Sequence, residues 1–163
     1  MKRTLYIVRH AQAVDHSLRI DDFSRDLTEQ GRSEATEIGN YLSQQKIQLQ
    51  EIISSSAHRT SSTAFILAER LQFDTKKIIL KDEMYQASVK LLLDIISNLS
   101  DDLYSVMLVG HNPSISQLVD YLSMEEEIEH FPTCTVAALQ FELDSWKKID
   151  KDTGILLFLQ SPF

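Results

Sequence analysis

Two histidines and two arginines stand just beyond three short apolar runs of the sequence. Arg9-His10 directly follows the first run, His111 follows another after a single glycine, and Arg59 comes a few residues after a third. A neutral imidazole is a good nucleophile because its pKa of about 6.5 leaves one ring nitrogen unprotonated near neutral pH. Guanidinium groups bind anions through forked donors that keep their charge. Together, these residue types favour nucleophilic chemistry on an anionic group.

Each of these residues also has an ordinary explanation when it is taken alone. The Arg-His pair could be a surface feature, the glycine before His111 could mark a common strand-to-helix turn, and Arg59 could be a solvated charge. A two-histidine metal site is a further alternative, but neither His10 nor His111 belongs to an HxxxH or HxH pair. No carboxylate stands at ligand spacing beside them, so we expect no metal and no cofactor.

The hydrophobic pattern predicts the elements that must bring these residues together. Short apolar or β-branched runs predict strands at 4–8, 52–53, 78–80, 106–109, 136–141 and 155–159. Apolar residues at helical spacing predict a helix after Thr28, a second with its inward residues between 64 and 71, a third from Ser88 to 99 and a fourth from Pro113 to 122. This alternation predicts an α/β three-layer sandwich, with a mainly parallel central sheet of about six strands and helices on both faces. Ligands bind beyond the carboxyl ends of such strands, where all four residues fall.

Composition limits the class of protein further. With 163 residues, 43% apolar and 25% charged, the chain is expected to form one domain over 1–163. The formal net charge of −8 argues against nucleic acid and anionic membranes as partners, so local cations must hold any anionic substrate. The apolar runs are too short to span a bilayer, the N-terminus lacks a secretory signal, and Cys134 is the one cysteine. A cytoplasmic location is expected.

Four motifs in the chain resemble those of the histidine phosphatase superfamily, which has a phosphoglycerate mutase-like fold. Arg9-His10-Ala11 resembles its Arg-His-Gly signature, residues 55–63 resemble Ser-Pro-x-x-Arg-x-x-Gln-Thr, Gly110-His111-Asn112-Pro113 resembles the second catalytic histidine, and residues 25–31 resemble Arg-Pro-Leu-Thr-x-x-Gly. The last element is typical of the SixA group of phosphohistidine phosphatases. The motifs occur in the family order over nearly the whole chain, which also lacks the large cap insertions of other members.

The sequence departs from the family pattern at four positions. Ala11 and Ser56 replace a glycine and a proline, while Asp26 and Ser62 replace a proline and a glutamine. Ala11 adds a methyl group beside the nucleophile, which ordinary backbone dihedrals tolerate unless positive φ is needed there. Asp26 adds a negative charge near a pocket for anions. These changes bear on substrate and rate more than on the class of reaction.

The resemblance implies a mechanism without a metal. His10 attacks phosphorus and carries the phosphoryl group as a covalent intermediate, which water then hydrolyses. Because phosphoryl transfer spreads charge over three oxygens, Arg9 and Arg59 would hold those oxygens and His111 would donate a further hydrogen bond. Glu83 stands where the superfamily often places its acidic residue, so it is the candidate general acid. A surface carboxylate is the alternative for Glu83.

Three further residues are candidates for substrate binding. Ser55 could donate to phosphate or only cap the following helix. Arg25 could reach the substrate from the loop 15–26, or form a salt bridge to Asp22 or Asp26. Asn112 lies beside the second histidine within its motif. His16 and His58 are interpreted as surface residues.

The expected substrate is phosphohistidine on a partner protein, and inorganic phosphate is the expected product. An imidazole leaving group, with a pKa of about 6.5, needs far less protonation than an alkoxide. One alternative is a small phosphate ester, which would depend on Glu83. The other is a catalytically weak module that binds phosphate or a phosphoprotein. The sequence makes no prediction of oligomeric state; Trp146 is assigned to packing and the acidic run 125–129 to solvated surface.

Overall fold

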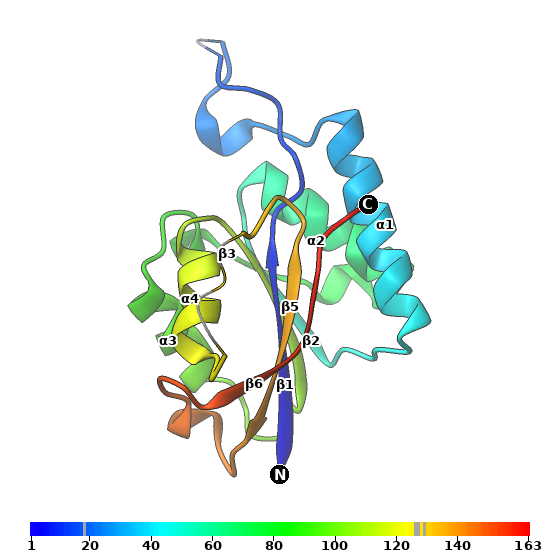
Figure 1. Ribbon diagram of the computed structural model, residues 1–163. Helices are drawn as coiled ribbons and strands as arrows, with labels where there is room; N and C mark the ends of the chain where they lie inside the picture. Colours follow the sequence, from blue (N-terminus) through cyan, green and yellow to red (C-terminus); the bar gives the residue numbers. More distant parts are fainter. Residues whose placement is uncertain (18, 126–127, 129) are drawn as a thin grey trace.

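A six-stranded sheet forms the centre of the computed structural model, which describes residues 1–17, 19–125, 128 and 130–163 (Figure 1). The strands are β1 (Lys2–Arg9), β2 (Glu51–Ser55), β3 (Ile79–Lys81), β4 (Ser105–Gly110), β5 (Val136–Glu142) and β6 (Gly154–Gln160). Their order is β3-β2-β4-β1-β5-β6; the first four lie parallel, while β5 is antiparallel to both β1 and β6. The predicted mainly parallel sheet is confirmed.

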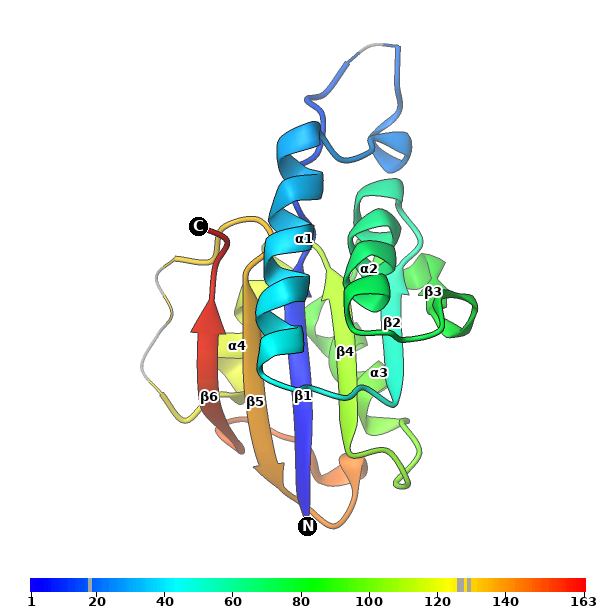
Figure 2. The same ribbon diagram turned by 90° about the vertical axis from the view of Figure 1, so that its right-hand side faces the viewer.

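Helices cover both faces of this sheet, as predicted (Figure 2). The helices α1 (Glu29–Gln44) and α2 (His58–Arg70) lie on one face, and α3 (Val89–Ser97) and α4 (Ser114–Leu122) lie on the other. Four short 3-10 helices lie in the connections: η1 (Asp22–Ser24), η2 (Thr75–Lys77), η3 (Asp82–Met84) and η4 (Trp146–Lys148). Thr28 and Ser88 cap α1 and α3 by accepting hydrogen bonds from backbone N–H groups.

The helix ends differ from the prediction by one to two residues. Leu71, predicted inside a helix, is the C-cap of α2, and Pro113 precedes α4 instead of lying in its first turn. Leu99 lies beyond the end of α3, although it still packs against the core. Helix ends have fewer internal hydrogen bonds than helix centres, which makes their position hard to read from apolar spacing alone.

Two apolar layers hold the sandwich together. Leu5 and Ile7 pack under α3 and α4, whereas Tyr6 and Val8 pack on the opposite face under α1 and α2. Since successive side chains of a strand point to opposite faces, a strand buried on both sides must be apolar throughout. Trp146 is fully buried against Phe141, so its assignment to packing is confirmed.

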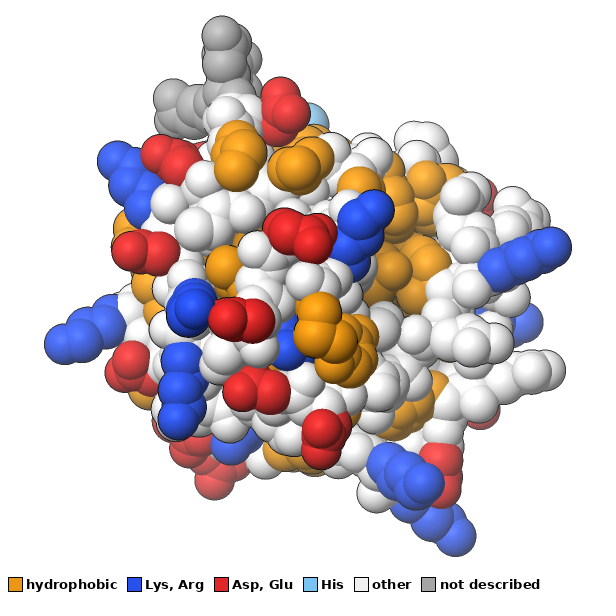
Figure 3. Space-filling model, turned by 90° about the horizontal axis from the view of Figure 1, so that it is seen from below, with side chains coloured by type: hydrophobic (Ala, Val, Ile, Leu, Met, Phe, Trp, Pro, Cys, Tyr) orange, Lys and Arg blue, Asp and Glu red, His pale blue; other side chains and the backbone are white. Residues whose placement is uncertain are grey.

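The surface around the starting ends of the strands carries interleaved acidic and basic side chains (Figure 3). Within the described residues, no helix is long and apolar enough to cross a membrane. The acidic run 125–129 lies in part outside the described residues, so its assignment to the surface stays a prediction.

Candidate active site

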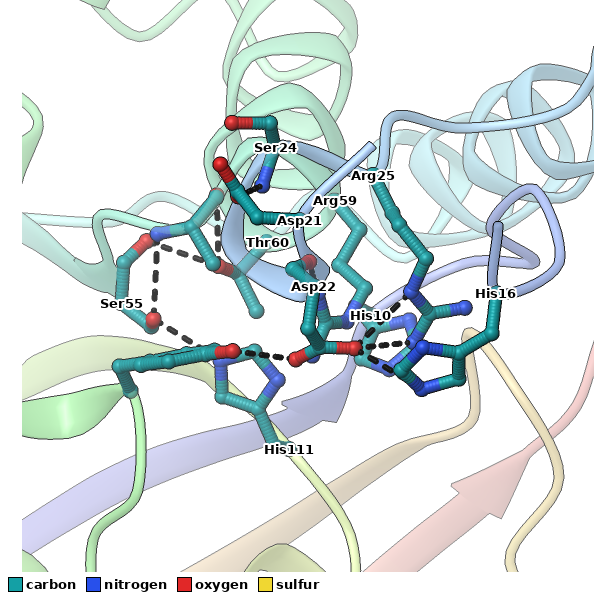
Figure 4. Close-up of polar contacts among 12 residues, drawn as sticks. His10, His16, Asp21, Asp22, Ser24, Arg25, Ser55, Arg59, Thr60 and His111 are labelled. Carbon is teal, nitrogen blue, oxygen red and sulfur yellow. Dashed lines mark hydrogen bonds and ion pairs between the residues drawn. The ribbon is translucent and has the colours of Figure 1, made fainter. Parts of the chain in front are cut away.

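The sheet register places the two candidate histidines side by side. Arg9 is paired with Gly110, and the N–H of His10 donates to the carbonyl of Gly110 at 3.0 Å. The carbonyl of His10 in turn accepts from the N–H of Cys134 at 3.0 Å. With the His10 backbone held from both sides, the imidazole rings of His10 and His111 lie 5.5 Å apart between centroids (Figure 4).

The hydrogen bond of His10 assigns its tautomer. Nδ1 lies 2.7 Å from the carbonyl oxygen of Ala11, and because a carbonyl only accepts, Nδ1 carries the proton. Nε2 therefore keeps its lone pair. Burial, together with the positive charges of Arg59 and Arg9, lowers the pKa of His10 to about 4. The ring is a neutral nucleophile over the whole physiological pH range.

His111 carries its proton on the same ring nitrogen as His10. Its Nε2 lies 2.8 Å from Ser55 Oγ, which already accepts a hydrogen bond of 3.3 Å from the N–H of Ala57. Among the described residues the Ser55 hydroxyl proton has His111 Nε2 as its acceptor, so it is donated to Nε2, which leaves the proton of His111 on Nδ1. Burial lowers the pKa of His111 to about 3, with further contributions from His10 and Arg59. Ser55 serves to orient His111, a role that the sequence did not indicate.

Arg9 and Arg59 each keep one buried donor without a protein partner. Arg59 is 6% exposed and donates from Nη1 to the Asp22 carbonyl at 2.7 Å and from Nη2 to the Asp22 carboxylate at 3.0 Å. Arg9 donates from Nη1 to the Phe131 carbonyl at 3.1 Å. In the described part of the chain, the buried side-chain polar atoms that lack a partner are Arg9 Nε, Arg59 Nε and His111 Nδ1. Buried donors without a partner are costly, and an oxyanion would satisfy all three.

Asp22, which the sequence offered only as a partner for Arg25, stands at the centre of the site. Its carboxylate accepts from Arg59, from the hydroxyl of Tyr85 and from Arg25, whose Nε and Nη2 both lie at 2.9 Å. The Tyr85 hydrogen bond, together with Arg59 and Arg25, holds the pKa of the Asp22 carboxyl well below its ordinary value. The same contact raises the pKa of Tyr85. The polar character of the loop 15–26 was the sequence signal for Asp22, and the sequence did not single out Tyr85.

A cleft of about 330 Å³ opens beside Asp22, Arg59 and His111, while His10 and Arg9 are not among the residues that line it. Its lining consists of Asp22, Arg59, Tyr85, Gln86, Ala87, His111, Asn112, Pro113 and Ser114. The side-chain amide of Asn112 is held at both ends, since Nδ2 donates to the Phe131 carbonyl at 3.4 Å and Oδ1 accepts from the Ser116 N–H at 3.2 Å. Arg25 forms the salt bridge to Asp22 that was the alternative to substrate binding, and also donates to the Val14 carbonyl at 2.7 Å.

Glu83 is not brought into this cleft, contrary to its prediction as the acid of the site. Its side chain is 53% exposed, and its carboxylate lies 3.6 Å from Lys81 Nζ. The short helix η3 buries Met84 and leaves Glu83 in solvent, so that Tyr85 faces His111 with ring centroids 5.6 Å apart. The alternative of a surface carboxylate describes its position.

The departures from the family pattern are accommodated locally. Ala11 is fully buried without positive φ, and its N–H donates to Thr63 Oγ1 at 3.0 Å. Two other departures compensate each other, because Ser62 Oγ donates to the Asp26 carboxylate at 2.8 Å. Asp26 also lies 3.3 Å from Arg32, which offsets its charge. The added acid thus has partners of its own outside the cleft lining.

Gly31 and Glu34 brace the segment that follows His10. A Cβ at Gly31 would lie 2.0 Å from the carbonyl oxygen of Gln12, so the start of α1 can approach that backbone only with glycine. Glu34, which is 8% exposed, accepts from the N–H of Gln12 at 2.8 Å and from the hydroxyl of Thr133 at 3.0 Å. The sequence did not single out Glu34; its position among the inward-facing residues of a helix was the available signal.

Potential metal ligands do not gather in the described part of the chain. No three His, Cys, Asp or Glu side chains of these residues lie close enough together to hold a metal ion. The site instead combines one unprotonated imidazole nitrogen with hydrogen-bond donors for an anion, in an α/β fold whose sheet has helices on both faces. This combination is suited to binding an oxyanion beside a histidine nucleophile.

Comparisons with known proteins identify the family. Residues 5–85 match the model of the histidine phosphatase superfamily (branch 1). A structure from Agrobacterium tumefaciens, titled a "putative phosphohistidine phosphatase SixA", is 29% identical with a TM-score of 0.83 and covers 99% of both chains. The structure of the protein histidine phosphatase SixA complexed with tungstate has the same fold, with a TM-score of 0.83, 22% identity and coverage of 98% of this chain and 97% of that one. The chain belongs to the histidine phosphatase superfamily.

A curated relative matches about half of the chain. The mitochondrial serine/threonine-protein phosphatase Pgam5 of Drosophila ananassae is 32% identical over 77 residues, which are 47% of this chain. The match spans 26% of that relative's own length.

Proposed function

We propose that the chain is a metal-independent phosphatase that forms a phosphohistidine intermediate on His10 and acts on phosphohistidine of a partner protein. The unprotonated Nε2 of His10, beside the unpaired donors Arg9 Nε, Arg59 Nε and His111 Nδ1, is the observation that carries this proposal. A phosphoryl group has one electrophilic phosphorus and several oxygens, so it matches one nucleophile and a set of donors.

The first step would form a bond between His10 Nε2 and phosphorus and break the bond from phosphorus to the leaving group, which keeps the electron pair. The His10 ring then becomes positively charged, and the Ala11 carbonyl stabilises its Nδ1–H at 2.7 Å. Water would attack phosphorus in the second step, lose a proton to solvent and release inorganic phosphate, while His10 recovers its neutral ring. Arg9, Arg59 and His111 would hold the phosphoryl oxygens in both steps.

The position of Glu83 supports phosphohistidine as substrate. An alkoxide leaving group needs a proton donor, and the Glu83 side chain is 53% exposed with its carboxylate near Lys81. An imidazole leaving group has a pKa of about 6.5 and needs little help. The similarity to the Agrobacterium tumefaciens protein, described as a "putative phosphohistidine phosphatase SixA", supports the same substrate.

A phosphate-release assay tests the proposal. Wild type, His10→Ala and a control, His130→Ala, are compared in EDTA on a phosphohistidine-bearing protein and on an aryl phosphate. His130 is an exposed histidine and should not affect turnover. We expect wild-type turnover of the phosphohistidine protein and its loss in His10→Ala alone. Turnover of only the aryl phosphate would indicate a small-molecule phosphatase, phosphate binding without turnover would indicate a binding module, and full activity of His10→Ala would refute the mechanism.

A further inference from the structure

Asp22 presents a carboxylate within a site built for an anion. It lines the cleft beside Arg59 and His111, and its side chain is 32% exposed. One oxygen accepts from Arg59 and Tyr85, and the other lies 2.9 Å from Nε and Nη2 of Arg25. A negative charge here repels phosphoryl oxygens, so phosphate binding alone does not explain its presence.

The contact between His16 and Asp22 shows that this carboxylate can bind an imidazole. The imidazole of His16, from the same loop, lies with Nε2 3.2 Å from Asp22 Oδ1 (Figure 4). The His16 side chain is 75% exposed, and an exposed pair of this kind contributes little free energy. An imidazole presented by another molecule can therefore take the place of His16 on Asp22. The protein thus carries an internal example of an imidazole bound next to its phosphoryl donors.

We infer that Asp22 is a specificity-determining residue that accepts an N–H from the imidazole of the substrate phosphohistidine, which selects this substrate over phosphate esters. The inference rests on the proposed function and extends it to the leaving group. In phosphohistidine one ring nitrogen bears phosphorus, and the other, when protonated, offers an N–H to a carboxylate. A phosphate ester has no such group at its leaving oxygen.

The chemistry balances without a general acid. When the bond from His10 Nε2 to phosphorus forms, the bond from phosphorus to the substrate nitrogen breaks, and that nitrogen keeps the electron pair. The N–H on the other nitrogen stays with Asp22, so the ring departs as neutral imidazole with one proton. A phosphate ester would instead leave an alkoxide next to a carboxylate that stays ionised, because Tyr85, Arg59 and Arg25 stabilise its charge. The same group that favours one leaving group disfavours the other.

Asp22→Asn tests this inference, since asparagine keeps the size of the side chain and removes its charge. Asp21→Asn is the matched control, because Asp21 caps η1 through the Ser24 N–H, whereas the side-chain hydrogen bonds of Arg59 go to Asp22. The variants and wild type are compared on a phosphohistidine peptide and on an aryl phosphate, with inorganic phosphate as a competitive inhibitor and thermal melting as a check of folding.

We expect Asp22→Asn to lower kcat/KM for the phosphohistidine peptide roughly tenfold to a hundredfold, as for a lost hydrogen bond to a charged group. The kcat/KM for the aryl phosphate should rise, and inorganic phosphate should inhibit at the same or a lower concentration, because a competing negative charge is gone. Asp21→Asn should behave as wild type on both substrates.

An equal fall on both substrates, with weaker inhibition by phosphate, would overturn the inference and show that Asp22 only orients Arg59. If wild type hydrolyses the aryl phosphate and leaves the phosphohistidine peptide intact, the proposed function itself fails. That result is visible in wild type alone, so the two failures are distinct.

Discussion

Strand β1 carries an arginine near each end, and the protein holds the two in opposite ways. Arg3, at the starting end, is 1% exposed and lies between the rings of Tyr104 and Trp146, 4.7 Å and 5.6 Å from their centroids. Its three nitrogens donate to four backbone carbonyls at 2.8 to 3.1 Å, those of Asp101, Leu103, Leu143 and Asp144. Each nitrogen of this guanidinium has a partner within the fold.

At the other end, Arg9 and its neighbour Arg59 are only partly used. Each has an Nε that is buried and without a partner among the described residues. Both ends bury a cation, so burial and charge do not separate a structural arginine from one that awaits a ligand. The number of donors that have a partner distinguishes the two kinds of arginine, because unpaired buried donors are unfavourable and are expected mainly at functional sites.

Arg3→Met should produce the largest effect on stability. It removes a donor from four backbone carbonyls, of which that of Leu103 keeps Trp146 Nε1, so we expect the free energy of unfolding to fall by about 3–5 kcal/mol. Urea denaturation measures this loss. The kcat/KM of the folded variant should stay within about twofold of wild type, since Arg3 stabilises the fold and does not line the cleft. Unchanged stability would contradict the role assigned to Arg3.

Arg59→Met should show the reverse pattern. Loss of a preorganised donor to the phosphoryl oxygens should lower kcat/KM roughly 10²- to 10³-fold. The free energy of unfolding should change by no more than about 1 kcal/mol, because Asp22 keeps Arg25 and Tyr85 as partners. Initial-rate kinetics and urea denaturation of the same preparation give both values. A loss of stability as large as that of Arg3→Met would remove the distinction between the two ends.

The pH dependence of stability should report the neutral histidines of the site. The pKa of His10 falls from 6.5 to about 4 on folding, so the unfolded chain binds more protons between these pH values. Stability should therefore decline as the pH falls through this window, by roughly 3 kcal/mol for His10. Urea denaturation at about pH 7 and about pH 4.5 should show a smaller decline for His10→Gln than for wild type. An equal decline in stability for wild type and His10→Gln would show that groups other than His10 cause the pH dependence.

Ser55→Ala should have the smallest effect of the four. Without the hydroxyl that fixes the tautomer of His111, we expect kcat/KM to fall roughly tenfold, the equivalent of one hydrogen bond. Ser54→Ala is the matched control, because Ser54 is an equally buried neighbour whose hydroxyl bonds the Ser55 carbonyl. Steady-state kinetics of both variants measure these effects. The same loss of kcat/KM in Ser54→Ala and Ser55→Ala would indicate general damage to β2 instead of a role of Ser55 through His111.

The sequence predicted the site only in part. His10, Arg9, Arg59 and His111 could be placed at one edge because each follows an apolar run, and parallel strands end together. Glu83 was predicted by the same reasoning and lies in solvent, since a single turn of η3 decides whether Glu83 or Tyr85 faces the cleft. Position along a chain does not fix such a rotation, which depends on the packing of Met84 below it.

The sequence by itself determined the layered sheet, the order of its elements and the edge at which the histidines meet. Apolar runs and helical spacing predict these features, because each pattern spans a few residues and indicates which side of an element is buried. Only the tertiary structure decided which ring nitrogen of each histidine carries a proton, and that Asp22 joins Arg59, Arg25 and Tyr85. Those contacts join residues as many as 63 positions apart, and their hydrogen bonds depend on the approach of separate segments that no local pattern encodes.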